Sequence, residues 1–182
     1  MPETRSLVFL GLCSVAGVAM AQLPAQTPSV YLQRDVASRG THALTLGATL
    51  PWGAWQKPLG PGVLSGFWDT YVSRWSYGGS GGRDHLWLLG LTPTLRWTPG
   101  EGRSPWFFQA GIGITLSDHL YRSADEQFST AFNFASHLGV GLRFGQARRQ
   151  EVVLRVQHLS NASIKSPNPG INYVQMRYGY HW

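Results

Sequence analysis

Residues 155–182 form the stretch that decides the fold, and they read RVQHLSNASIKSPNPGINYVQMRYGYHW. A run of alternating apolar and polar residues reaches His158 and Ser160, and a second alternating run ends the protein on an aromatic residue. A loop rich in proline, asparagine and glycine separates the two runs. Alternation with a period of two is typical of β-strands, so this stretch predicts a β-hairpin.

The same alternation extends over almost all of the chain after residue 22, where helical periodicity is almost absent. Six further strands are predicted at about residues 29–36, 41–52, 63–75, 85–97, 106–117 and 131–144. Connections rich in glycine, proline or polar residues are expected at 56–62, 77–84, 98–105 and 118–130. With the last hairpin, the chain has eight predicted strands of roughly ten residues, long enough to cross a bilayer when tilted.

Each predicted strand has one continuous apolar face and one face of Thr, Gln, Asn, Gly or Arg. A water-soluble sandwich or lipocalin would bury the apolar faces inside. Five arginines fall on the inferred inner face, too many charges for an ordinary small core: Arg74, Arg96, Arg143, Arg155 and Arg177. The sequence therefore predicts an all-β fold, an eight-stranded antiparallel transmembrane β-barrel with a polar or small interior and a lipid-facing apolar exterior.

Two assignments depend on the phase of single strands. Within residues 63–75, Phe67, Tyr71 and Trp75 are placed on the lipid-facing side, and Asp69 falls on that side without an explanation from the sequence. Aromatic residues near strand ends are expected to form girdles at the two membrane interfaces: Trp52, Trp75, Trp97, Trp106 and Tyr178.

Residues 1–21 are predicted to be a cleaved signal peptide, which leaves residues 22–182 as the barrel domain. Arg5 is followed by an apolar run from Leu7 to Ala19, and Ala19-Met-Ala21 fits a small-x-small cleavage site. The run is short for a membrane anchor, and no stop-transfer charges follow it. The only cysteine, Cys13, lies in this segment, so the mature chain has no disulfide and no cysteine nucleophile.

The formal net charge of +6 comes mostly from arginine, since Lys57 and Lys165 are the only lysines. Arginine suits phosphate and carboxylate groups, and for an exported protein the expected phosphates are those of lipid head groups. The sequence holds no nucleic-acid-binding motif. An ordinary basic surface is the alternative interpretation of the charge.

His158 and Ser160 are the best candidates for chemistry. With both chain ends in the periplasm, the seventh strand runs outward and carries both residues at its outer end. They share the lipid-facing phase of the apolar residues in 152–156, and Asn172 has the same phase on the last strand. A histidine can take a serine proton and return it to a leaving group, while a third group holds the imidazole. A site on the outer wall would act on a membrane component.

Three segments carry a resemblance to a known family: HLSNA at 158–162, PNPGIN at 167–172, and Arg177-Tyr178. Together they resemble the PagL-type lipid A 3-O-deacylases, which are eight-stranded outer-membrane barrels. The resemblance implies an esterase that hydrolyses the 3-O-linked 3-hydroxyacyl chain of lipid A, with lipopolysaccharide of the outer leaflet as its substrate. The aromatic C-terminal end also resembles the signal read by the outer-membrane assembly machinery, a second expected partner.

The resemblance implies that Ser160 is the nucleophile and His158 the general base. Asn161 falls where an oxyanion-hole residue is expected, with the backbone N–H near Ser163 as a second donor. The third catalytic residue of the family can be a glutamate, and here Asn172 stands at that position. An acid of the long outer loop is the alternative third member: Asp118, Asp125 or Glu126.

Two other functions stay open from the sequence, namely a non-catalytic outer-membrane barrel with a structural or adhesive role and a soluble ligand-binding barrel. We expect no metal and no cofactor, because the remaining histidines form no metal-ligand spacing: His42, His85, His119, His137 and His181. A homodimer is left open.

Overall fold

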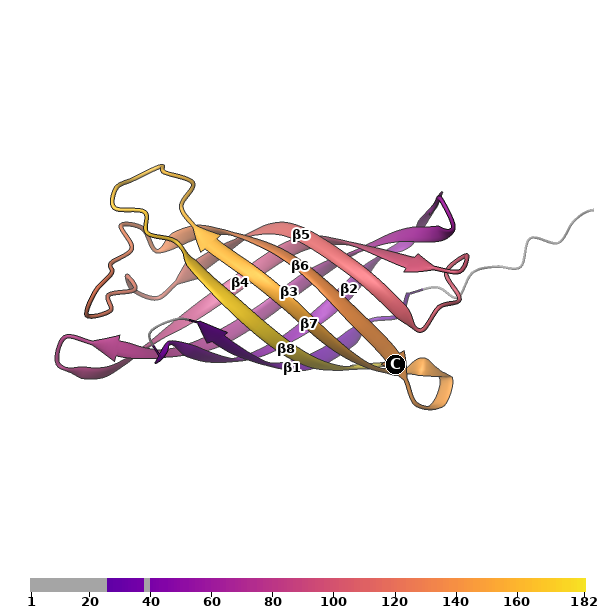
Figure 1. Ribbon diagram of the computed structural model, residues 1–182, viewed down its shortest axis with the longest axis horizontal. Coiled ribbons are helices and arrows are strands. Elements are labelled where there is room, and N and C mark those ends of the chain that lie inside the picture. Colours follow the sequence, from indigo (N-terminus) through magenta and orange to yellow (C-terminus); the bar gives the residue numbers. More distant parts are fainter. Residues whose placement is uncertain (1–25, 38–39) are drawn as a thin grey trace, which may run out of the picture.

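The computed structural model describes residues 26–37 and 40–182. Eight antiparallel strands form a closed barrel in which each strand pairs with its neighbours in sequence and β1 pairs with β8 (Figure 1). The predicted fold is therefore confirmed. The strands are β1 Ser29–Ala37, β2 His42–Leu59, β3 Gly62–Gly79, β4 Gly82–Pro99, β5 Trp106–Ser117, β6 Phe132–Phe144, β7 Gln150–Ser160 and β8 Ile171–His181, with a short 3-10 helix, η2, at Gln146–Arg148.

The predicted signal peptide, residues 1–21 with Cys13, lies outside the described residues and stays a prediction. Within the part of the chain that is described, no helix is long and apolar enough to cross a membrane.

The hairpins at both ends of the barrel are longer than predicted. β2, β3 and β4 have 18 residues each. Residues 56–62 and 77–84, expected to be connections, continue the strands, and only residues 60–61 and 80–81 form turns. Pairing runs to Leu59↔Gly62 and Gly79↔Gly82. The ladder satisfies backbone N–H and C=O groups that a loop would leave to water, so pairing overrides the local preference for a turn.

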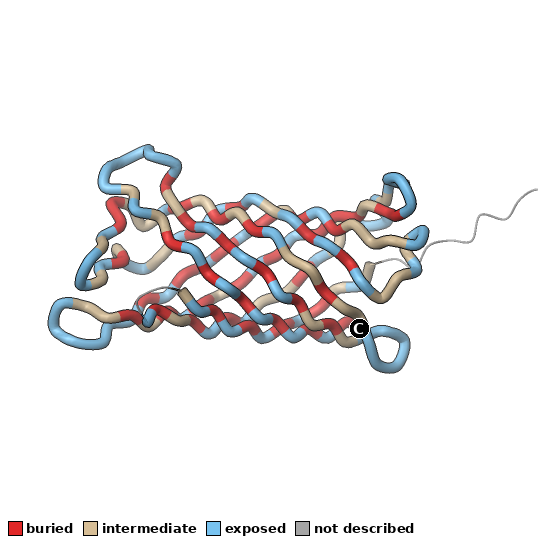
Figure 2. The backbone as a smooth tube through the Cα atoms, viewed as in Figure 1, coloured by how far each residue is buried: buried red, intermediate tan, exposed pale blue. Residues whose placement is uncertain are grey.

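Buried and exposed residues alternate along the strands, as the red and pale blue segments of Figure 2 show. Large apolar residues with more than half of their surface exposed occur on most strands: Leu46, Leu89, Ile112, Leu138, Leu154 and Met176. A soluble monomer rarely exposes so extended an apolar surface. The outer wall is therefore a lipid-facing surface, and this rules out the soluble ligand-binding barrel.

The interior is filled by polar and charged side chains, with Asp69 at the centre. Asp69 accepts hydrogen bonds from Tyr31 Oη at 2.5 Å, Arg155 Nη1 at 3.0 Å and Arg177 Nη2 at 2.7 Å. Gln33 and Gln175 accept from the two arginine Nε atoms. All of these side chains are buried, so a charge network that lipid would not tolerate is enclosed by the barrel.

The predicted phase of β3 was wrong. Phe67, Tyr71 and Trp75 point into the barrel together with Asp69, whereas Arg74 is exposed on the outer wall. Arg74 pairs in register with the lipid-facing Leu44. Trp75 is consequently part of the interior and not of an aromatic girdle.

The other inner arginines lie around Glu151, which is nearer to the chain ends than the Asp69 network. Arg96 donates to Glu151 from Nη1 at 3.0 Å and from Nη2 at 3.2 Å, and His181 Nε2 lies 2.9 Å from the same carboxylate. Arg143 is half-buried, with its Nε 3.6 Å from Glu151. The inner positions predicted for Arg96, Arg155 and Arg177 are thus correct, and these networks fill the half of the barrel near the chain ends.

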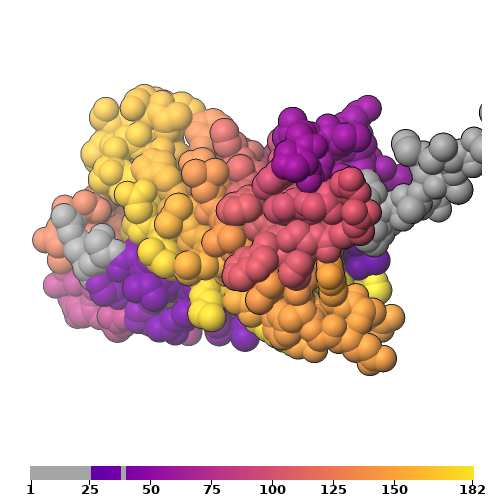
Figure 3. All heavy atoms as spheres, turned by 45° about the vertical axis from the view of Figure 1, so that its right-hand side comes forward, coloured from indigo at the N-terminus to yellow at the C-terminus, as the bar shows by residue number. Residues whose placement is uncertain are grey.

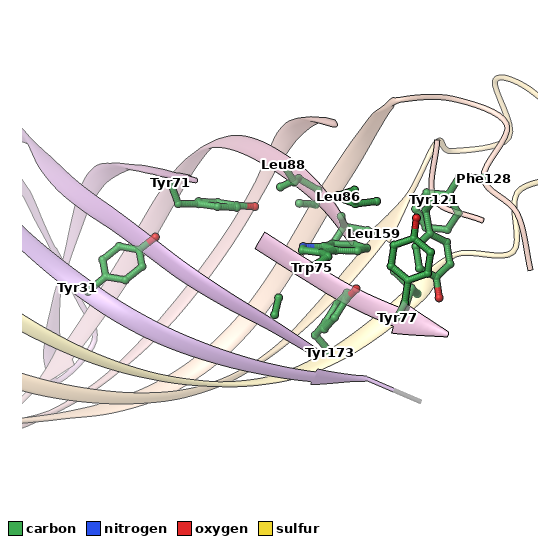
Figure 4. Packing of buried hydrophobic residues seen from close by; sticks show 13 residues of the cluster. Tyr31, Tyr71, Trp75, Tyr77, Leu86, Leu88, Tyr121, Phe128, Leu159 and Tyr173 are labelled. Carbon is green, nitrogen blue, oxygen red and sulfur yellow. The ribbon is translucent and has the colours of Figure 1, made fainter. Parts of the chain in front are cut away.

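Aromatic side chains close the outer end, which is the end with the β5–β6 and β7–β8 connections. Figure 4 shows Trp75, Tyr77, Tyr121, Phe128 and Tyr173 gathered there. The Trp75 and Tyr173 rings are 4.9 Å apart, and the Tyr77 and Tyr121 rings are 4.6 Å apart. Tyr121 and Phe128 come from the β5–β6 connection, which folds into the barrel mouth. The aromatic side chains therefore close the outer mouth of the barrel, above the charge networks.

Candidate active site

His158 and Asn172 form a direct pair on the outer wall. They are register partners on β7 and β8, both are exposed, and His158 Nδ1 lies 2.8 Å from Asn172 Oδ1. An amide oxygen can only accept, so Nδ1 carries the proton and donates it to this bond. Nε2 is left with a free lone pair, the state that a general base requires.

Ser160 lies on the same face of β7, two residues beyond His158 at the end of the strand, and is half-buried. Two residues along a strand separate side chains by about 6.7 Å. Among the described residues there is no hydrogen bond between Ser160 and His158, and catalytic hydrogen bonds are often long before substrate binds. The structure thus places His158, Ser160 and Asn172 together on the lipid-facing side, with a hydrogen bond between the histidine and the asparagine.

Gly170, in the β7–β8 loop, leaves room for the imidazole. Its φ of +65° is in the left-handed region that favours glycine. A Cβ on this residue would lie 2.8 Å from His158 Cε1 and 3.3 Å from Nε2. Both the backbone and the imidazole therefore require glycine here.

Asn161 ties the β7–β8 loop to the barrel mouth. Its buried Nδ2 group donates to Ser129 Oγ at 2.9 Å and to the Lys165 carbonyl at 2.8 Å, and its backbone N–H donates to Asn168 Oδ1 at 3.0 Å. Ser129 also donates to the Lys165 carbonyl. Both side-chain amide hydrogens of Asn161 and its backbone N–H are used in these contacts, and its oxyanion role stays a prediction.

The next two residues are further candidate donors for an oxyanion. Ala162 and Ser163 have φ values of +52° and +63°, so the chain makes a tight left-handed turn directly after Ser160 and Asn161. Within the described residues, neither backbone N–H has a hydrogen-bond acceptor. Successive N–H groups in a turn can form an anion-binding concavity, and the backbone oxyanion donor near Ser163 stays a prediction.

In the structure Asn172 contacts His158 Nδ1, and the acids of the outer loop stay the predicted alternative for the third member. Asp118 Oδ1 accepts a hydrogen bond from the Trp87 backbone N–H at 3.1 Å and lies 2.8 Å from His119 Nδ1. Asp125 and Glu126 lie further along the same β5–β6 connection. Asn172 is the group that contacts the imidazole.

Ser136 is a neighbour of His158 that the sequence analysis missed. It is the direct register partner of His158 on β6 and shares its outward face. Register partners of this kind have Cβ atoms about 5 Å apart. Only the pairing of β6 with β7 reveals this second hydroxyl, since 22 positions separate the two residues in sequence.

An apolar groove of about 1510 Å³ begins beside the pair and continues over the outer wall. His158, Asn172 and Ser136 contribute polar groups at the end of the groove nearest the β7–β8 loop. The rest of the lining is mainly aliphatic and aromatic: Val36, Leu64, Leu95, Ala110, Ile112, Leu138, Val156, Val174, Trp52 and Trp55. A polar reacting centre is thus continuous with a surface that suits hydrocarbon.

Among the described residues, no group of three or more His, Cys, Asp or Glu side chains could hold a metal ion. The chemistry available to the site is that of a hydroxyl, an imidazole, an amide and backbone N–H groups.

Comparison with known proteins shows the family of the chain. Residues 42–181 match the family described as Lipid A 3-O-deacylase (PagL). The Lipid A deacylase PagL of Pseudomonas aeruginosa is 30% identical over 98% of both chains. That of Bordetella bronchiseptica is 37% identical over 61% of this chain, and the aligned part spans only 59% of that relative.

A solved structure, the outer membrane enzyme PagL, superposes with a TM-score of 0.71 at 24% identity. The match covers 85% of this chain and 99% of that one, and it shows the shared barrel fold. The chain belongs to the lipid A 3-O-deacylase (PagL) family.

Proposed function

We propose that the chain is an outer-membrane esterase that removes the 3-O-linked 3-hydroxyacyl chain of lipid A. The observation that carries this function is the 2.8 Å His158–Asn172 contact on the lipid-facing wall, next to a hydroxyl and at the head of an apolar groove. Membership of the family supports the same substrate. An acyl chain in the outer leaflet can reach this site from the side without leaving the membrane.

In the proposed mechanism, Ser160 Oγ attacks the ester carbonyl while His158 Nε2 takes the hydroxyl proton. The N–H groups of Ala162 and Ser163 stabilise the oxyanion. The tetrahedral intermediate expels the sugar oxygen, which receives the proton from His158, and an acyl-Ser160 ester remains. Water, deprotonated by His158, then hydrolyses this ester and releases the hydroxy fatty acid.

Asn172 keeps the proton of His158 on Nδ1, so that Nε2 always faces the reaction as a base. An amide cannot add the charge that would stabilise the imidazolium formed during catalysis. The proposed triad is therefore oriented but electrostatically weaker than one with a glutamate.

The implied location is the outer membrane, with lipopolysaccharide of the outer leaflet as the partner. Recognition by the outer-membrane assembly machinery rests on the C-terminal strand β8 and on Trp182, whose side chain is exposed at the end of the chain. A homodimer stays a prediction, which cross-linking of the barrel in outer membranes would test.

Mass spectrometry of lipid A from cells that express the protein tests the function. Wild type is expected to produce lipid A that lacks one 3-hydroxyacyl chain, whereas Ser160→Ala should leave lipid A intact. Ser76→Ala, another half-buried serine toward the outer end of a strand, is the matched control and should behave as wild type.

Two outcomes would contradict parts of this proposal. Loss of activity in Ser136→Ala with retention in Ser160→Ala would make Ser136 the nucleophile. Intact lipid A in cells that contain the folded wild-type barrel would contradict the esterase function. Altered surface adhesion of those cells would then favour the structural or adhesive barrel.

Gly170→Ala is expected to reduce ester hydrolysis by about 100-fold, because a shift of about 1 Å in a catalytic group can have that effect. The matched control is Gly60→Ala. Gly60 has a similar φ of +56°, but its added Cβ would meet no atom of the described residues within 4 Å. The two variants should lose similar stability, and only Gly170→Ala should lose activity. Equal rates in the two purified variants would show that Gly170 does not position the imidazole.

A further inference from the structure

The groove beside His158 follows a continuous course across neighbouring strands. His158 pairs with Ser136, whose partner on β5 is Ile112. One step further along β6 and β5, Leu138 pairs with Ala110, and Ala110 pairs with Leu95 on β4. The small Ala110 side chain leaves the middle of this path open.

The path descends toward the chain-end side of the barrel. His158 lies two residues from the outer end of β7, whereas Trp52 and Trp55 lie in the half of β2 nearer the turn at residues 60–61. From β7 to β3 the path crosses four strand spacings of about 4.8 Å, or roughly 19 Å. One leaflet of hydrocarbon is about 15 Å deep, so an inclined acyl chain fits the path from head-group level downward.

Two tryptophans close the far end. The pairing of β2 with β3 is interrupted between Pro51 and Gln56, and Gly53 within this bulge has a φ of +57°. The bulge brings the Trp52 and Trp55 rings within 5.7 Å of each other. In the space-filling view of Figure 3, the purple segment around residue 50 stands out from the wall.

Gly66 provides the place on which Trp52 rests. Gly66 is the register partner of Leu95 on the outward face of β3, and a Cβ there would overlap the six-membered ring of Trp52. The Trp52 indole therefore packs directly over Gly66, where the groove arrives from Leu95. Trp68 makes an edge contact with this indole, with ring centroids 5.8 Å apart. Trp52 thus packs against both Gly66 and Trp68.

We infer that Trp52 and Trp55 form the end stop of an acyl-length ruler. The 3-hydroxyacyl chain whose ester lies at Ser160 occupies the groove over Ala110, and its terminal methyl reaches the two tryptophans. This inference rests on the proposed esterase function and adds to it a specificity determinant. Chains too short to fill the groove lose contact, and chains too long meet the indoles.

The ruler predicts opposite effects from two substitutions. Trp55→Ala removes one indole from the end stop, lengthens the groove and should favour longer acyl chains. Ala110→Phe fills the middle of the groove and should favour shorter acyl chains. Since the acyl chain already lies in hydrocarbon, each methylene that gains or loses contact should change kcat/KM by less than the roughly fourfold expected for transfer from water. Ala110 faces lipid, and an aromatic residue there is compatible with a β-strand.

The experiment gives the purified, detergent-solubilised barrel an equimolar mixture of lipopolysaccharides whose 3-O-linked chains differ in length. Mass spectrometry of the released hydroxy fatty acids measures the ratio of kcat/KM values directly. Ala48→Phe and Trp87→Ala are the matched controls. Both residues lie on the outer wall, and neither lines the groove within the described structure. A shift of the gel band on heating confirms that each barrel is folded.

Opposite shifts in Trp55→Ala and Ala110→Phe, with unchanged ratios in both controls, would support the ruler. A wild-type ratio in both groove variants, or an equal shift in the controls, would overturn it. Because wild type is measured in the same mixture, release of no fatty acid at all is a separate result, in which the esterase function fails and the ruler fails with it.

Discussion

Replacing His158 with alanine is expected to lower kcat for ester hydrolysis by about 10⁴- to 10⁶-fold, the range found when the base of a serine–histidine pair is removed. No neighbouring side chain can take over the proton, since Asn172 is an amide and Ser136 a hydroxyl. KM should change little, because the groove that holds the acyl chain is mainly apolar. Steady-state kinetics on purified barrel would measure both constants.

Substitutions at Asn172 distinguish two contributions to catalysis, the orientation of the His158 ring and a negative charge beside it. Asn172→Ala removes the 2.8 Å contact and should reduce kcat by about 100-fold through loss of ring orientation. Asn172→Glu should raise kcat by about tenfold or more, because a carboxylate near 4 Å stabilises an imidazolium by roughly 1–4 kcal/mol. A kcat in Asn172→Ala equal to that of wild type would exclude Asn172 from the triad and direct attention to the acids of the β5–β6 connection.

Replacing Asp69 with alanine is expected to destabilise the barrel by about 3–5 kcal/mol, the usual cost of leaving buried charges without their partner. The guanidinium groups of Arg155 and Arg177 would lose the carboxylate to which both donate. Tyr31 would also lose the acceptor of its hydroxyl. Urea unfolding of the barrel in detergent or lipid vesicles, followed by tryptophan fluorescence, would give the change in free energy.

Two variants control this measurement. Asp69→Asn keeps an acceptor oxygen and should lose less stability than Asp69→Ala. Glu101→Ala removes an exposed ion pair with Arg103 in the β4–β5 connection and should have little effect on the free energy of unfolding. If Asp69→Ala unfolds at the same urea concentration as Glu101→Ala, the Asp69 network does not hold the barrel together.

The alternating pattern predicted the barrel and most strand phases, because valine or leucine alternates with arginine or glutamine on β7 and β8. The same reasoning failed on β3. Phe67, Tyr71 and Trp75 are as apolar as lipid-facing residues, yet they fill the interior. Asp69 was the residue that could have decided the phase, since a carboxylate on the lipid side has no partner. Arg74 was misleading because a long arginine can extend along the wall to the interface.

The candidate site was only partly predictable for a different physical reason. Parity alone places His158, Ser160 and Asn172 on the outer wall. The 2.8 Å contact and the approach of Ser136 depend on strand register, which the sequence does not specify over a loop of this length. The contributions of Asn161 and Gly170 depend on loop conformation. The positive φ values at residues 162, 163 and 170 could not be derived from the order of the residues.

The filled interior has a consequence for how the enzyme meets its substrate. With the Asp69 and Glu151 networks below and the aromatic cluster above, nothing enters or leaves through the barrel axis. Substrate and both products must travel sideways, within the plane of the leaflet. The relevant concentration is therefore a mole fraction at the membrane surface. Diluting the substrate with inert lipid should slow the reaction, while diluting the whole suspension with buffer should not.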